Sequence, residues 1–129
     1  MGGEKHRRKY LRYNSNNSAS HYFTLPNKIF CLGLSSGEIA VYSFLLRCEN
    51  RKTYQCYPSY RTIGKALKMS QNTVRKYVQS LEDKHLITTE RTEVITKDGQ
   101  KRNGTLLYTI RPIREAIDYF HIEQLRKNA

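Results

Sequence analysis

The feature that most constrains this chain is a pair of short helical patterns joined by only three residues, Lys68-Met69-Ser70. Ser59 and Ser70 stand where an N-cap is expected, because a serine hydroxyl can accept a hydrogen bond from a free N–H group of the first helical turn. Two helices with so short a connection must pack against each other. We therefore expect the apolar residues at helical spacing in the two helices to form one core with Met69. These residues are Ile63, Ala66 and Leu67 in the first helix, and Val74, Tyr77, Val78 and Leu81 in the second.

The second helix, about residues 73–82, has a polar face of a particular kind. Asn72, Arg75 and Gln79 are spaced by three and four residues, so they project from one stripe, opposite Tyr77 and Val78. Arginine can pair bidentately with guanine, and asparagine or glutamine with adenine, in the major groove of DNA. The pattern therefore predicts a helix-turn-helix that reads double-stranded DNA. The predicted base-reading residues are Gln71, Asn72, Arg75 and Gln79.

The charge of the chain supports a polyanionic partner. The 129 residues carry a net charge of +12, for which nucleic acid is the leading partner and an anionic membrane surface the second. The sequence between Glu49 and Glu82 contains no acidic residue and seven basic ones, whereas a solvated helix pair would mix signs. Hydroxyls and free N–H groups at helix starts suit phosphates. The predicted phosphate contacts are Ser59, Arg61, Lys68, Ser70, Thr73 and Lys76.

Two further elements flank this helix pair. Ser35-Ser36-Gly37-Glu38 is a capping box, which predicts a helix carrying Tyr42, Leu45 and Leu46 and ending near Asn50. Residues 86–96 and 105–110 predict two strands joined by the turn sequence Lys97-Asp98-Gly99-Gln100. A basic hairpin tip can lie along a DNA backbone or enter the minor groove. The tip residues predicted to contact DNA are Lys97, Lys101 and Arg102.

After Pro112, a last helix is predicted from the stripe Ile113, Ala116, Ile117 and Phe120. The predicted fold class is α+β, a winged helix-turn-helix with a three-helix core, a β-hairpin wing and an added C-terminal helix. Residues 1–21 predict a disordered basic arm, either a solvated tail or a DNA contact; residues 22–111 predict the DNA-binding domain. In residues 112–129 the helix stripe either packs on the chain's own first helix or forms a homodimer with a second copy.

Other classes of function find little support in the sequence. The histidines are scattered without metal-ligand spacing, Cys31, Cys48 and Cys56 lack C-x-x-C spacing, and no phosphate-binding glycine loop is present. We therefore expect no enzyme activity, metal or cofactor. No apolar run approaches the roughly 18 residues of a membrane helix, and the N-terminus lacks a secretory signal, so we expect a cytoplasmic protein. Tyr54, Tyr57 and Tyr60 could instead stack on single-stranded nucleic acid.

Several segments also resemble a known bacterial family over about residues 23–110. They are Leu25-Pro26-Asn27-Lys28-Ile29-Phe30, Leu32-Gly33-Leu34-Ser35, Glu38-Ile39-Ala40-Val41-Tyr42, Pro58-Ser59-Tyr60-Arg61-Thr62-Ile63 and Ser70-Gln71-Asn72-Thr73-Val74-Arg75-Lys76-Tyr77. The resemblance is to the winged-helix domain of plasmid and phage replication initiators and related small regulators of Gram-positive bacteria. It implies DNA binding, as a transcriptional regulator on or near a mobile element or as the DNA-binding module of an initiator. A protein-interaction winged helix is the alternative from another class.

Overall fold

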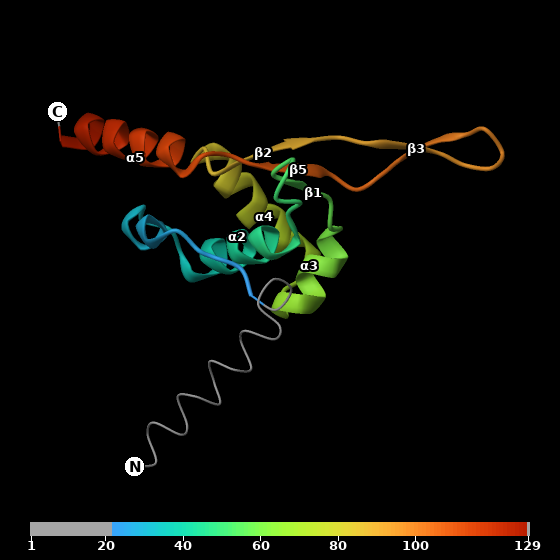
Figure 1. Ribbon diagram of the computed structural model, residues 1–129, viewed down its shortest axis with the longest axis horizontal. Coiled ribbons are helices and arrows are strands. Elements are labelled where there is room, and N and C mark those ends of the chain that lie inside the picture. The colour runs from blue at the N-terminus through green and yellow to red at the C-terminus, as the bar shows by residue number, and fades with distance from the viewer. Residues whose placement is uncertain (1–21, 129) are drawn as a thin grey trace, which may run out of the picture.

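A computed structural model of the chain describes residues 22–128, so the arm predicted for residues 1–21 lies outside the described part. Figure 1 shows a group of helices below a small sheet, a long hairpin on one side and the last helix on the other. The helices are η1 (Asn27–Cys31, a 3₁₀ helix), α2 (Ser36–Cys48), α3 (Tyr60–Leu67), α4 (Gln71–Asp83) and α5 (Ile113–Asn128). The strands are β1 (Gln55–Cys56), β2 (Ile87–Glu90), β3 (Glu93–Ile95), β4 (Lys101–Asn103) and β5 (Leu107–Ile110).

The predicted helix starts are confirmed by their caps. Ser35 Oγ accepts a hydrogen bond from the Glu38 N–H at 3.2 Å, and the Glu38 carboxylate accepts one from the Ser35 N–H at 2.9 Å. Ser59 and Ser70 cap α3 and α4 with hydroxyls that accept from the third helical N–H at 3.0 and 3.2 Å. Because these bonds satisfy donors that no helix can pair internally, they determine where each helix begins.

The core follows the predicted stripe of α4, with one correction in α3. Val74, Val78 and Leu81 are buried, and Tyr77 is half-buried. The prediction that Ala66 is buried was wrong, because Ala66 is exposed and Gly64 takes the buried place. A Cβ atom on Gly64 would lie 2.5 Å from the Met69 carbonyl oxygen, so only glycine lets the α3–α4 connection pass this closely.

A three-stranded antiparallel sheet in the order β1-β5-β2 closes the core. The sequence did not predict β1, since its two residues are too few to show a strand periodicity. In the sheet Cys56 pairs with Tyr108 and Ile87 pairs with Ile110, and all four residues are buried. The central strand β5 is therefore paired along both edges.

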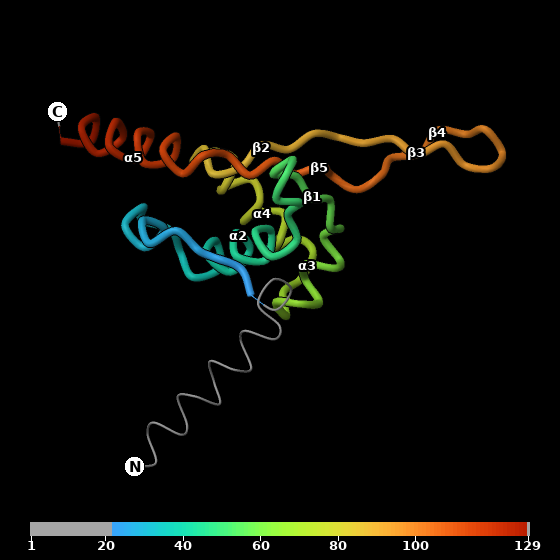
Figure 2. Tube along the Cα trace, in the orientation of Figure 1, coloured from blue at the N-terminus to red at the C-terminus, as the bar shows by residue number. Residues whose placement is uncertain are grey.

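The predicted hairpin is confirmed but is divided in two. Its outer half, which we call the wing, consists of β3, β4 and the turn between them, and Figure 2 shows it extending away from the helices. Between the halves the Gly104 N–H donates to the Thr92 carbonyl at 2.8 Å, and the Thr92 hydroxyl donates to the Thr105 carbonyl. Thr105 begins no strand, contrary to the prediction, and Lys101 and Arg102 lie in β4 rather than in the turn.

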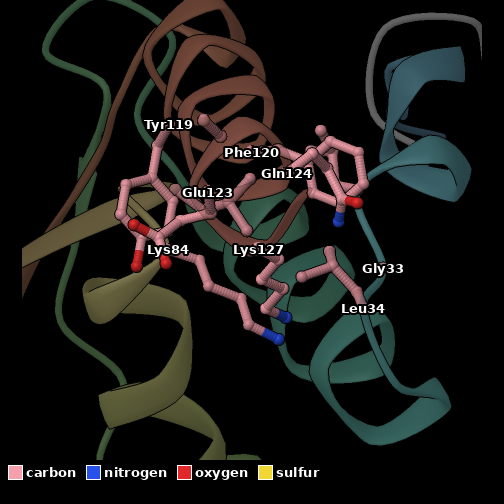
Figure 3. A pocket seen from close by; sticks show the side chains of 11 residues that line it. Gly33, Leu34, Lys84, Tyr119, Phe120, Glu123, Gln124 and Lys127 are labelled. Carbon is pink, nitrogen blue, oxygen red and sulfur yellow. The ribbon is translucent and has the colours of Figure 1, made fainter. Parts of the chain in front are cut away.

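The stripe of α5 packs on the chain itself. Ala116 is buried, while Ile113, Ile117 and Phe120 are partly buried against the core. Figure 3 shows Phe120 and neighbouring α5 side chains facing Leu34, from the turn before α2, and Lys84, from the end of α4, across a pocket of about 250 Å³. Among residues 22–128, no helix is both long and apolar enough to cross a membrane.

Replacing Leu81 should test this packing. Leu81 is 0% exposed at the centre of the core, so Leu81→Ala should lower the free energy of unfolding by about 2–5 kcal/mol through lost burial and a residual cavity. Urea unfolding followed by circular dichroism measures the change. Ile95→Ala is the matched control, because Ile95 is 71% exposed on the wing and its truncation should change stability little. Equal effects of both substitutions would mean that the faces of the helices are misassigned.

Candidate nucleic-acid interface

The turn between α3 and α4 sets the position of the predicted recognition helix. Lys68 ends α3 in a left-handed conformation with φ 57°, and the Met69 N–H donates to the Gly64 carbonyl at 2.9 Å. A left-handed residue reverses the chain direction at a helix end. The next residue, Ser70, already caps α4. Two helices are thus joined over three residues, as the sequence analysis predicted.

The structure brings the predicted base-reading residues together on one outward face. Val74, Val78 and Leu81 turn into the core, which leaves the other side of α4 free. Consequently the side chains predicted to contact bases, together with Lys76, are all exposed: Gln71, Asn72, Arg75 and Gln79. That they bind bases stays a prediction.

The two serines predicted to contact phosphates also form hydrogen bonds within the starts of α3 and α4. Ser70 Oγ lies 2.9 Å from Thr73 Oγ1, and Ser59 Oγ lies 2.9 Å from Thr62 Oγ1, in addition to their capping bonds. These pairs orient the first turns of α4 and α3. Three of the remaining predicted phosphate contacts are exposed cations: Arg61, Lys68 and Lys76.

A groove that the sequence did not reveal joins the helix pair to the base of the wing. It has a volume of about 800 Å³ and is lined by Ser59 and Arg61 from α3, Gln71 from α4 and Asn103 from β4. Tyr57, 70% exposed, also lines it. Because Asn103 is distant in sequence from the helices, periodicity could not place it beside them. Tyr57 and Tyr60 line this groove, whereas Tyr54 lines another cleft, so the three tyrosines do not share one surface.

The cations of the acid-free stretch remain unpaired. All seven are exposed, and none forms an ion pair with another of the described residues 22–128. Elsewhere Lys84, Arg111, Arg114 and Arg126 each pair with a carboxylate. The helix pair therefore presents uncompensated positive charge, in the set Arg51, Lys52, Arg61, Lys65, Lys68, Arg75 and Lys76.

The far end of α4 is held by Glu38, which is 5% exposed. Its carboxylate accepts hydrogen bonds from Ser80 Oγ at 2.6 Å and from Lys84 Nζ at 2.9 and 3.1 Å, besides the capping bond from Ser35. Burial raises the pKa of Glu38, but the hydrogen bonds from Ser35, Ser80 and Lys84 outweigh it and lower the pKa to about 2. We call these four residues the Glu38 cluster; it joins the start of α2 to the end of α4.

Comparison with known proteins supports this architecture. Residues 32–87 match a family described as a helix-turn-helix domain. A solved structure described as "Possible transcriptional regulator from Methanosarcina mazei Go1" is 21% identical, with a TM-score of 0.51, and the match covers 77% of this chain and 78% of that one. The fold is a winged helix-turn-helix. The predicted fold class, with its added C-terminal helix, is thereby confirmed.

Other solved structures are less similar. The Lactococcus lactis ZitR C30AH42A mutant is 17% identical, with a TM-score of 0.46 and coverage of 99% of this chain and 80% of that one. The adhesin competence repressor AdcR of Streptococcus pyogenes is 16% identical, with a TM-score of 0.44 and coverage of 94% and 75%. No curated protein matches the chain.

The lowered pKa of Glu38 predicts how stability depends on pH. A carboxylate whose pKa falls from 4.5 to about 2 on folding stabilises the protein by about 3 kcal/mol above pH 4.5, and the contribution is lost as the pH falls from 4.5 towards 2. Glu38→Gln should therefore be less stable than the wild type at pH 7, and the difference should shrink as the pH approaches 2. Urea unfolding at several pH values measures it, with Glu93→Gln on the exposed wing as the control. A difference that does not change with pH would contradict the assignment.

Proposed function

We propose that this protein binds specific sequences of double-stranded DNA, with α4 in the major groove, and thereby regulates transcription. The observation that carries the proposal is the exposed, unpaired positive charge of the helix pair. Leaving so many cations without partners has an electrostatic cost that a phosphate backbone would remove, with release of its counterions. A protein-interaction role would not need a stretch free of acids.

The roles of the contacts should differ. Asn72, Arg75 and Gln79 lie on the exposed face of α4, which would enter the major groove of the DNA, and their side chains would contact base edges. Lys97, Lys101 and Arg102 lie on the wing, far along the hairpin, and would contact the flanking backbone or minor groove. The groove between these two surfaces is about 800 Å³ and carries the polar side chains of Arg61, Gln71 and Asn103 in a largely apolar lining. It would receive the DNA strand that runs between the two surfaces.

Two similarities support the proposed biological setting. The neighbour from Methanosarcina mazei Go1 is described as a "possible transcriptional regulator". The resemblance of residues 58–63 and 70–77 to the initiator family supports a place on or near a mobile element. Origin binding by a replication module is the alternative that this same resemblance supports.

We further propose that two copies associate through the second half of α5. The apolar stripe of α5 up to Phe120 packs against the core of the same chain. Beyond it, Ile122 and Leu125 are 57% and 72% exposed. Two apolar residues three positions apart on a helix form one surface. Charge permits a second copy there, because Glu123 pairs with Arg126 within the helix at 3.0 Å, whereas copies meeting through the helix pair would repel.

The recognition role can be tested by separating base contacts from backbone contacts. Arg75→Ala should weaken binding to the selected DNA site by about 1–3 kcal/mol and broaden the sequences accepted, because a bidentate base contact is lost. Selection of bound duplexes from a random pool gives the site, and fluorescence anisotropy gives the affinity. Lys101→Ala is the control, since a phosphate contact should weaken all sequences alike and lower the salt slope by about one. No enriched sequence, or an Arg75→Ala variant with unchanged preference, would refute the proposal.

The association of copies has its own test. Leu125→Glu should weaken self-association at least tenfold, because an ion replaces an apolar residue at the contact. Analytical ultracentrifugation over a range of protein concentrations measures it. Gln124→Glu, which adds the same charge at an exposed position on another side of α5, should leave self-association nearly unchanged. A wild-type protein that stays monomeric on its DNA site would exclude this dimer while leaving the recognition helix intact.

A further inference from the structure

A cleft of about 700 Å³ lies away from every predicted DNA contact. It is formed by the end of α2, the loop before β1, the end of β5 and the first turn of α5. Much of its wall is apolar, from Leu25, Leu46, Ile110 and Ile113. A cleft of this size and lining is typical of sites for small organic molecules, which also need a few polar groups to orient the ligand.

The polar group in this cleft is Glu49, the residue that ends α2. Its Oε2 atom is buried and has no hydrogen-bond partner among residues 22–128. No described cation lies within ion-pair distance of it either, although Arg51 is near enough to oppose the rise in the pKa of Glu49 that burial causes. A buried carboxylate oxygen without a partner is costly, and a positive charge in the cleft would lower that cost.

Two tyrosines, Tyr42 and Tyr54, line the cleft together with Glu49. Tyr42 is 1% exposed, and burial together with the Glu49 charge raises its pKa to about 12, so its hydroxyl stays protonated and neutral. Tyr54 is 58% exposed and is held rigidly, because its N–H donates to the Asn50 carbonyl at 2.7 Å and its own carbonyl accepts from the Ile110 N–H at 2.8 Å. Its φ of 59° is unusual for a tyrosine. Aromatic faces attract cations.

The other charge at the cleft is already neutralised. Arg111 lines the cleft, but its guanidinium donates to both carboxylate oxygens of Glu115, at 3.1 and 3.3 Å. Glu49 is therefore the group in the lining whose charge has no described partner. The cleft consequently selects for positive charge and against negative charge.

We propose that this cleft binds a small organic cation, an amine or quaternary ammonium with an apolar or aromatic body. Its charged group lies against the Glu49 carboxylate and the face of Tyr54, and its apolar body covers Leu46, Ile110 and Ile113. The proposal does not depend on DNA binding, because none of the predicted DNA contacts lines the cleft.

Calorimetric titration of the full chain without DNA tests it, with benzyltrimethylammonium as the probe. We expect saturable one-site binding at millimolar or lower concentration, and no binding of benzenesulfonate, which has a similar ring and the opposite charge. Glu49→Gln should weaken binding at least tenfold while keeping the shape of the side chain. Glu90→Gln, an exposed carboxylate outside the cleft, is the matched control and should bind as the wild type does.

A second variant separates the aromatic contribution from folding. Tyr54→Leu keeps an apolar side chain at an exposed position and should weaken binding several-fold without lowering the melting temperature by much. The proposal is overturned if the wild type binds no benzyltrimethylammonium. It is equally overturned if Glu49→Gln binds it unchanged, or if benzenesulfonate binds as well as the cation does.

Discussion

The structure depends above all on how α4 is held against the other two helices of the core. At its N-terminus, the close passage of the connection over Gly64 leaves one way to place α4 on α3. At its C-terminus, the Glu38 cluster ties it to the start of α2. Between these ends, Val74, Val78 and Leu81 are buried. A helix fixed at both ends and along one side cannot rotate, so its outward side chains keep one orientation.

The same interactions shape the electrostatics of the surface. Glu38 is buried in its cluster, and Glu82, which ends the acid-free stretch, accepts hydrogen bonds from the Thr89 N–H and hydroxyl at 2.9 and 2.8 Å. Glu49, at the other end of that stretch, has a buried carboxylate oxygen. Glu38, Glu49 and Glu82 are thus used inside the fold. They bind local donors or line a cleft, and the cations outside them remain without partners.

Local chemistry made much of this predictable. A serine cap states where a helix starts, so α2, α3 and α4 begin where Ser35, Ser59 and Ser70 indicate. A one-sided apolar stripe states which face is buried, and that was enough for α4. The apolar stripe gave the wrong buried residue in α3, because Gly64 has no side chain and so does not appear in a hydrophobic pattern. Gly64 is nevertheless buried by its close contact with the Met69 carbonyl, and Ala66 is exposed.

Features that arise only when distant segments meet were beyond such reasoning. The strand β1 exists because β5 offers it a free edge, not because two residues prefer a strand. The groove that joins Tyr57 and Arg61 to Asn103 requires the hairpin to return beside α3. The sequence alone does not distinguish Glu49 from a surface carboxylate. Its place in the cleft depends on the end of β5 and the first turn of α5, which line the same cleft.

The central strand β5 connects the surfaces to which functions have been assigned. It is paired on both edges, with β1 and β2, so its four residues form a stiff connection. At one end it leads from the wing, and at the other its last residue, Ile110, lines the cleft before α5 begins. A molecule bound in the cleft and a DNA backbone held by the wing would therefore act on opposite ends of the same strand. Because α5 follows β5 directly, the position of this strand would also influence how two associated copies are oriented relative to each other.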